Sequence, residues 1–193
     1  MTTNQHTSRE AWLQAFADAS RPYFAAANFP LPPNIRMSIG FPSSGKRSKA
    51  IGECWGEASS EDGNFEIFIK PTLDSAARIA DVLTHELCHA AVGLQAKHGA
   101  RFRRCATALG LESKMTATKA GDAWRAWALP VIEAFGPLPA APMRLGGSSA
   151  APKQSTRMLK RECNACGLTM RLSAKWAESA TRCPDAACEG ELA

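Results

Sequence analysis

The chain has 193 residues, seven cysteines and a formal net charge of +5, and 45% of its residues are hydrophobic. This composition suits one domain with an ordinary core and a small appendage. No run of about 18 apolar residues is present, which argues against a membrane span. The N-terminal segment has no apolar signal-peptide core. Seven cysteines without a secretion signal argue against a disulfide framework. We therefore expect a cytoplasmic protein, nucleoid-associated if bacterial and nuclear if eukaryotic.

The first part of the chain alternates helical and strand-like patterns. Residues 10–27 carry apolar side chains at helical spacing, with Ser8 or Thr7 as a cap, and a Phe-Pro-Leu-Pro-Pro stretch ends this helix. Strand patterns then occupy three segments separated by polar turns, residues 35–41, 50–55 and 65–70.

A long apolar helix is expected after Pro71, which closes the third strand, with Asp74 or Ser75 as its cap. Two more helical patterns follow over residues 100–109 and 122–135. The chain therefore contains both helices and strands before its linker.

The long helix carries the sequence His85-Glu86-Leu87-Cys88-His89. Histidines four residues apart lie on one helix face, so both imidazoles can bind one metal ion. A catalytic zinc needs a third protein ligand and an open position, and His98 is the nearest other histidine. Zinc lowers the pKa of a water that it binds to about 7, and Glu86 is placed to take the proton as general base.

Other interpretations of this motif stand beside a zinc site. A single helical histidine is more often a surface or core residue than a ligand, but burying two histidines and Glu86 without a partner would be costly. Cys88 is interpreted as a core residue, with a regulatory thiol as the weaker alternative. A distant glutamate as third ligand stays open on spacing alone. Val92 and Gln95 occupy the positions of the metzincin glycine and third histidine, so the chain is not a metzincin.

Residues 136–156 are rich in Pro, Gly, Ser and Ala, and we predict a flexible linker there. Positive charge is concentrated around His98 and in the cysteine-rich segment after the linker. Between Arg144 and Arg182 there are eight Lys and Arg residues against two acids. Such a distribution attracts nucleic-acid phosphates, whereas for any single residue a solvated surface is the favoured interpretation.

Four cysteines near the end of the chain can supply four thiolates to one structural zinc: Cys163, Cys166, Cys183 and Cys188. A module of this size cannot bury much of a core, so metal binding would supply its folding energy. A redox dithiol at Cys163 and Cys166 is the alternative. Candidate nucleic-acid contacts in this module are six cations and one aromatic side chain that can stack on a base: Arg157, Lys160, Arg161, Arg171, Lys175, Arg182 and Trp176.

The His-Glu-x-x-His helix followed by His98-Gly99-x-x-Phe102 resembles the SprT/Spartan family. The strand segments before the helix and the paired cysteines after the linker extend the resemblance to about residues 8–190. One departure is the spacing between Cys183 and Cys188, where four residues stand instead of the usual two. The resemblance implies an α+β fold with a small antiparallel sheet packed on the motif helix. It also implies a peptidase domain at residues 8–135, a linker at 136–156, a zinc ribbon at 157–193, and His98 as the third zinc ligand.

The leading hypothesis is a monomeric zinc endopeptidase that acts on proteins bound or crosslinked to DNA. It would hold one catalytic and one structural zinc ion, and would bind DNA without sequence preference. A non-catalytic nucleic-acid or transcription-associated zinc-binding protein is the alternative, and Glu86 argues against it, because a metal scaffold does not need that carboxylate. A zinc hydrolase of small molecules would instead require a closed pocket.

Overall fold

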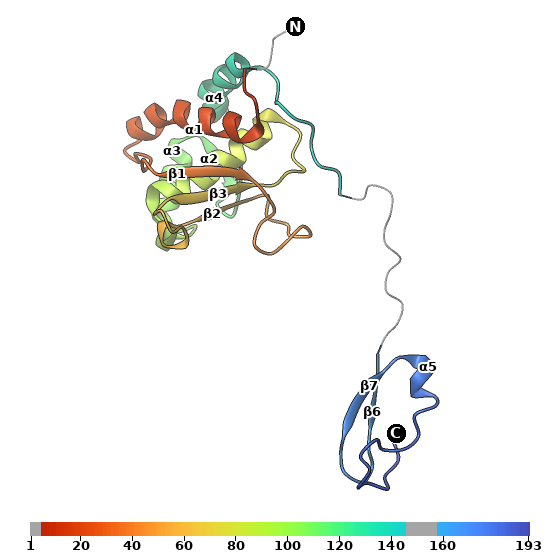
Figure 1. The fold of residues 1–193 in the computed structure, drawn as a ribbon. Helices are drawn as coiled ribbons and strands as arrows, with labels where there is room; N and C mark the ends of the chain where they lie inside the picture. Colours follow the sequence, from red (N-terminus) through yellow and green to blue (C-terminus); the bar gives the residue numbers. More distant parts are fainter. Residues whose placement is uncertain (1–4, 146–157) are drawn as a thin grey trace. The chain divides into compact units, whose positions relative to one another are not determined.

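The computed structural model describes residues 5–145 and 158–193, and the chain divides into two compact units, residues 1–145 and 146–193 (Figure 1). Among the described helices, none combines the length and apolar character needed to cross a membrane.

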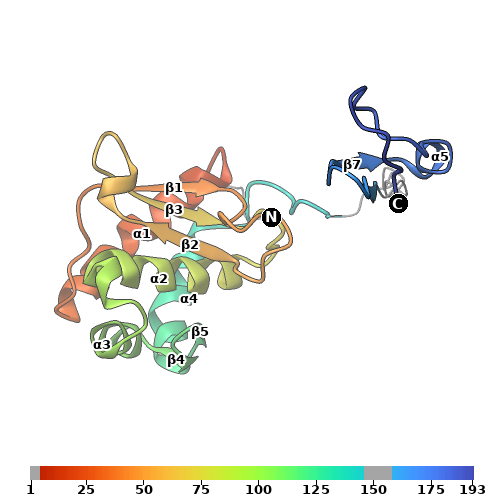
Figure 2. The ribbon, with the colours of Figure 1, turned by 90° about the horizontal axis from the view of Figure 1, so that it is seen from below.

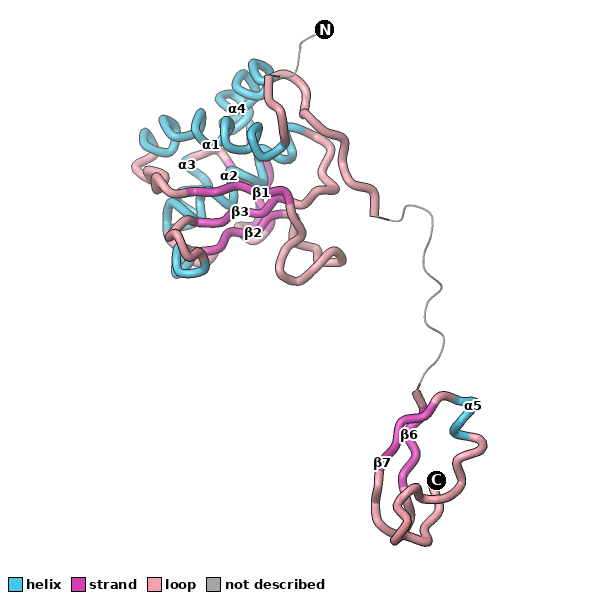
Figure 3. Tube along the Cα trace, viewed as in Figure 1, coloured by secondary structure: helices cyan, strands magenta, loops and turns pink. Residues whose placement is uncertain are grey.

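The first unit contains four α-helices and two small sheets in its described residues (Figure 3). The helices are α1 Arg9–Ala26, α2 Ala76–Val92, α3 Ala100–Ala108 and α4 Asp122–Phe135. The strands are β1 Ile35–Ile39, β2 Gly52–Trp55, β3 Phe65–Ile69, β4 Leu111–Lys114 and β5 Ala117–Ala120. Two single 3-10 turns complete it, Glu57–Ser59 and Leu94–Ala96.

The three-stranded sheet has the order β1-β3-β2 and is mixed, which corrects the antiparallel sheet expected from the sequence. β2 pairs with β3 antiparallel, whereas β1 pairs with β3 parallel, Ile35 lying opposite Phe65. The chain crosses from β1 to the far side of the sheet before forming β2, and β3 then fills the gap between them. β2 runs opposite to β1, and β3 reverses direction again relative to β2, so β3 runs parallel to β1.

α1 and α2 pack on one face of this sheet (Figure 2). The alternating pattern of β3 turns Phe65, Ile67 and Ile69 toward these helices, and all three are buried. α2 also contacts α3, α4 and β5, so it runs through the middle of the unit. This placement explains why its sequence is apolar on nearly every side and why its polar motif residues are enclosed.

The hairpin of β4 and β5 was not assigned from the sequence. Its strands pair antiparallel, with Thr118 opposite Ser113, and it lies between α3 and α4 in the chain. The carboxylate of Asp81 on α2 accepts a hydrogen bond from the backbone N–H of Ala120 at 3.3 Å. The same carboxylate accepts two hydrogen bonds from Arg78 at 2.8 Å each.

The first unit continues past Phe135 as far as Leu145, beyond the point where the sequence predicts a linker to begin. The guanidinium of Arg9, only 6% exposed, donates from Nη2 to the carbonyl of Ala140 at 2.8 Å and from Nη1 to that of Leu73 at 2.9 Å. The N–H of Met143 donates to the carbonyl of Pro71 at 2.9 Å. The segment after α4 is therefore bonded to the unit, and the predicted linker residues from 146 onward lie outside the described residues.

The second unit contains the hairpin β6 Leu159–Glu162 and β7 Thr169–Leu172, followed by the short helix α5 Ala174–Ala177. The chain then returns, and Leu192 forms an isolated bridge with Cys163. Among the described residues of this unit, the buried hydrophobic ones are Cys163 and Ala177, both with small side chains. Such a small core leaves the folding of this unit dependent on something besides apolar burial.

Candidate metal centres

α2 fixes the position of three motif residues. The helix starts at Ser75, whose hydroxyl accepts from the N–H of Arg78 at 3.3 Å, and it ends at Gly93, whose φ of 82° suits glycine. His85 and His89 lie one turn apart on the helix. Glu86 is 7% exposed and His89 is 9% exposed, so the motif lies at the inner edge of a cleft and not on an open surface.

His98 reaches the same point through the turn that follows α2. Gly93 and Lys97, with φ values of 82° and 45°, reverse the chain around the 3-10 turn at Leu94–Ala96. The Nε2 atom of His98 then lies 3.2 Å from Nε2 of His89 and 3.3 Å from Nε2 of His85. The structure thus brings together the three histidines that the sequence singled out.

These distances fit a zinc ion. Ligand nitrogens at about 2.0–2.1 Å from zinc in a tetrahedral arrangement lie about 3.3–3.4 Å apart. The ring of Phe102 supports all three imidazoles, with centroid separations of 4.9 Å from His85, 4.4 Å from His89 and 5.0 Å from His98. Phe102 is itself fully buried, so the ligand rings rest against the core.

The three imidazoles are held in the neutral form that binds metal. Burial lowers the pKa of His85 to about 3 and that of His89 to about 4, and mutual repulsion among the rings adds to both shifts. Burial also lowers the pKa of His98. Neutral imidazoles keep a lone pair available at Nε2, which is the atom each ring directs toward the others.

Thr118 of the unassigned hairpin makes a direct contact with the first histidine. Its Oγ1 lies 2.8 Å from Nδ1 of His85, the ring nitrogen that does not face the other histidines. When Nε2 of a histidine binds metal, Nδ1 carries the hydrogen and donates it, which fixes the ring's tautomer and orientation. The Nδ1 atom of His89 is buried and has no such partner among the residues the structure describes. The sequence signal for this hairpin was faint: a ten-residue segment between Gly110 and Gly121 with Thr at two positions.

Glu86 occupies space that Gly52 leaves free on β2. A Cβ atom at Gly52 would lie 2.5 Å from Oε1 of Glu86 and 2.8 Å from a methyl of Val82, so a larger residue would displace the carboxylate. Burial, together with the smaller effect of the Glu53 carboxylate, raises the pKa of Glu86 to about 8. A bound cation would lower that pKa again. The side chain is therefore poised to exchange a proton near neutral pH.

The histidines and Glu86 line a cleft of about 600 Å³. One wall is the edge strand β2 with the residues before it, and the other wall is formed by Thr116, Ala117 and Thr118 of the hairpin. Cys54 also lines the cleft, whereas Cys88 is fully buried in the core, as the sequence predicted.

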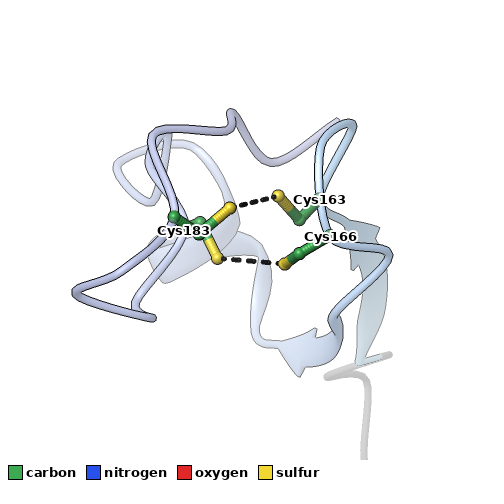
Figure 4. A group of neighbouring side chains, drawn as sticks. Cys163, Cys166 and Cys183 are labelled. Atoms are coloured by element: carbon green, nitrogen blue, oxygen red, sulfur yellow. Dashed lines mark hydrogen bonds between the residues drawn. The ribbon is translucent and has the colours of Figure 1, made fainter.

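Four cysteines of the second unit form another cluster (Figure 4). Sγ of Cys163 lies 3.6 Å from that of Cys188, and Sγ of Cys166 lies 3.7 Å from that of Cys183. Four sulfurs at about 2.3 Å from a zinc ion would lie about 3.8 Å apart. The donor set and the spacing fit a closed structural zinc site, and the redox alternative does not account for the second pair.

The longer spacing before Cys188 is accommodated by a local turn. The N–H of Cys188 donates to the carbonyl of Asp185 at 2.9 Å, which brings the sulfur back toward the cluster. Gly190 packs directly against the cysteine cluster: a Cβ atom at this position would lie 2.4 Å from Sγ of Cys163. Backbone N–H groups of Cys166 and Ala165 lower the pKa of Cys163 to about 6, which favours its thiolate.

The predicted nucleic-acid contacts of the second unit do not all lie on one face of its hairpin. Lys160 and Arg171 lie directly opposite each other in the β6–β7 hairpin, whereas Arg161 pairs with Met170 and so points to the other face. Trp176 is 59% exposed, and the Nζ atom of Lys175 lies 5.1 Å from its ring centroid. Arg182 is exposed, and its backbone forms an isolated antiparallel β-bridge with that of Glu191. Arg157 lies outside the described residues.

The first unit is an α+β domain in which three histidines, two of them on a His-Glu-x-x-His helix, surround one point. This arrangement places the protein in the class with a three-histidine, zinc-type metal site beside an acidic side chain. Comparison with known families sharpens this class: the SprT-like family matches residues 15–120, more than half of the chain. The protein belongs to the SprT-like family, which is generally zinc-metallopeptidase-like. Comparisons with curated proteins and with solved structures gave no match.

Proposed function

We propose that the protein is a zinc-dependent endopeptidase that cleaves proteins bound or crosslinked to DNA. The observation that carries the proposal is the meeting of three Nε2 atoms, with His98 3.2–3.3 Å from the other two, next to the buried carboxylate of Glu86. Three protein ligands leave one position of a tetrahedral zinc open for water or substrate. The family membership supports the same chemistry.

The edge of β2 supports a peptide as the substrate. The N–H of Lys70 donates to the carbonyl of Ile51, which sets the alternation of the antiparallel ladder. The backbone groups of Gly52 and Cys54 consequently point away from β3, toward the open edge. An extended peptide can pair with these groups beside the metal centre. A small-molecule hydrolase has no use for such an edge.

Glu86 is assigned as the general base and acid. Zinc, when bound by His85, His89 and His98, would supply a Lewis acid for the scissile carbonyl and lower the pKa of a water to about 7. The Glu86 carboxylate takes a proton from the attacking water and then delivers it to the leaving amine. Gly52 keeps that carboxylate in place by leaving room for it. Thr118 holds the ring of His85 in orientation through Nδ1.

The DNA part of the proposal rests on the charge of the second unit. Lys160, Arg171 and Lys175 are exposed, and the exposed ring of Trp176 offers a surface on which a base can stack. Contacts of this kind bind phosphates and bases without a sequence code. The non-catalytic alternative would use the same surface without hydrolysis.

The deciding experiment measures cleavage of a DNA-binding protein by the full chain, with and without single-stranded DNA, beside the Glu86→Gln variant. We expect cleavage by the natural sequence, stimulation by DNA, and a loss of about 10²–10⁴-fold in the variant, with zinc content retained. Equal activity of the two proteins would remove the peptidase mechanism. An absence of cleavage together with DNA binding would favour the non-catalytic alternative.

A further inference from the structure

The loop between β1 and β2 extends from one end of the sheet (Figure 1) and is ordered by internal hydrogen bonds. We call residues 42–49 the basic loop. The N–H of Gly45, whose φ is 84°, donates to the carbonyl of Pro42 at 2.7 Å, and the N–H of Ser48 donates to the carbonyl of Gly45 at 2.9 Å. The hydroxyl of Ser44 donates to that of Ser48 at 2.7 Å. These bonds hold the loop in one conformation, so its side chains leave it at fixed points.

Three cations extend from this loop into solvent: Lys46, Arg47 and Lys49. None of them takes part in an ion pair with any residue in the described ranges. The nearest acid in sequence, Glu53, is already engaged. Its carboxylate accepts from the N–H of Ser43 at 2.8 Å and from the Ser43 hydroxyl at 2.6 Å. The indole of Trp55 donates to it at 3.1 Å. The loop therefore concentrates positive charge that the protein does not neutralise.

A fourth cation lies beneath the basic loop. Lys70 is only 9% exposed, and its Nζ atom donates to the carbonyl of Ser48 at 2.7 Å. An ammonium group has three donor hydrogens, and this carbonyl is the one acceptor the structure describes for it. Two of these hydrogens are therefore left for an anion or for water. The site thus combines three surface cations, two serine hydroxyls and one largely buried lysine.

The basic loop lies beside the metal centre. Lys49 lines the same cleft as His85, Glu86 and His89, and β2 starts three residues after it. A ligand held by the loop would sit at the mouth of that cleft, next to the edge of β2 where a peptide substrate pairs.

We propose that the basic loop and Lys70 bind phosphate groups of a nucleic-acid backbone. Several cations at fixed spacing match a chain of phosphates better than a single anion, and lysine, arginine and serine are the side chains that make such contacts. This proposal rests on the proposed cleavage of DNA-bound proteins. Phosphates held by the basic loop would place the nucleic acid within reach of the cleft, independently of the second unit. The loop also gives the first unit a DNA contact of its own.

The test compares two triple variants of the full chain that remove the same charge. One is Lys46→Gln with Arg47→Gln and Lys49→Gln. The matched control is Arg101→Gln with Arg103→Gln and Arg104→Gln, three exposed cations on α3. Affinity for a fluorescent duplex oligonucleotide is measured by anisotropy at several salt concentrations. Each lost phosphate contact lowers the slope of log affinity against log salt by about 0.9.

We expect the loop variant to lower that slope by about 2–3 and to weaken binding about tenfold or more near physiological salt, and the α3 variant to change the slope by less than about 1. A Lys70→Met variant, which keeps the buried stem and removes the ammonium, should weaken binding in the same direction with unchanged zinc content. An unchanged slope in the loop variant, or equal losses in both triple variants, would overturn the proposal.

Two competitors at constant ionic strength identify the source of the anion. If inorganic phosphate saturates the loop while oligonucleotide binding is indifferent to its cations, the site takes a small anion and the nucleic-acid assignment is wrong. If polyglutamate of matched charge competes as well as DNA, the loop recognises acidic protein. Since the readout is binding, a loss of DNA affinity stands even if no peptidase activity is found, so the two proposals fail separately.

Discussion

The two candidate metal centres differ in what surrounds them. The three histidines rest on Phe102 and on a core in which Trp12, Phe16, Ile67 and Leu87 are fully buried. The four cysteines join a hairpin to a returning chain, with Cys163 and Ala177 as the buried hydrophobic residues. We therefore expect the fold around the first centre to persist without metal, and the second unit to depend on its metal for folding. Three ligands and an open side suit chemistry, whereas four thiolates suit structure.

The largest effect that would sharpen this comparison is metal removal. Treatment of the full chain with a strong chelator should unfold the second unit, because zinc binding by small four-ligand modules contributes about 10–16 kcal/mol at pH 7. The first unit should stay folded. Amide spectra by NMR check this: signals of Gly167 and Gly190 should lose dispersion while those of Ile67 and Leu87 keep it. Persistence of the second unit without metal would break the comparison.

A ligand substitution should separate the two centres by stoichiometry. His98→Ala should reduce the zinc content from about two ions per chain to about one, since a catalytic site with two protein ligands binds weakly. Cys188→Ser should remove the other ion instead. Metal analysis after gel filtration measures both. If His98→Ala keeps both ions and its activity, the third ligand is a carboxylate elsewhere.

A pH series on the metal-free protein tests how strongly the buried carboxyl group of Glu86 makes the stability of the first unit depend on pH. Burial raises the pKa of Glu86 to about 8, so the folded state holds a proton that the unfolded state has released above about pH 4.5. Its contribution to stability is present below the unfolded pKa and is lost as pH rises through 8. His85 and His89, with pKa values lowered to about 3 and 4, act in the opposite sense below about 6.5.

The window from pH 6.5 to 8 therefore isolates Glu86. There we expect the free energy of unfolding to fall by about 2 kcal/mol. Urea unfolding followed by tryptophan fluorescence measures it, since Trp12 and Trp124 are buried in the first unit. Glu86→Gln should abolish the fall. A fall of equal size in that variant would assign it to another group.

The smallest expected effect concerns Thr118. Removing its hydroxyl in Thr118→Val should weaken zinc binding at the three-histidine centre by about tenfold, the lower end for partners that orient a ligand histidine. Thr118→Ser should keep the affinity. Competition with a chelator of known affinity measures the change. Thr84→Val is a matched control, because Thr84 is buried on α2 and bonds Trp124 at 2.9 Å and not a ligand. Equal losses in both valine variants would make the effect one of general packing.

Sequence reasoning reached the parts of the site whose spacing is local. His85, Glu86 and His89 follow from one helical turn, and His98 follows from the scarcity of histidine and the His-Gly-x-x-Phe pattern. Thr118 could not be found in this way, because it lies 33 residues from His85 and threonine is a common residue. Gly52 was likewise invisible, since its role depends on which strand faces α2.

The sheet shows a second limit. Each strand segment shows its own alternation of apolar and polar side chains, and β1, β2 and β3 all fall within the predicted ranges. The direction of a strand in the sheet does not follow from this local pattern. It depends on which strand enters the middle of the sheet, and the choice of β3 makes the sheet mixed. Tertiary order is a property of the whole core and not of any one segment.

Arg9 has a practical consequence for dissecting this chain. Its side chain donates hydrogen bonds to the carbonyls of Leu73 and Ala140, and so links the start of α1 to the end of the unit. A fragment that ends at Phe135 would lack the carbonyl of Ala140, and the buried guanidinium of Arg9 would lose this hydrogen-bond acceptor. A fragment meant to contain the first unit alone should therefore end after Leu145, so that Arg9 and its acceptors stay in one chain.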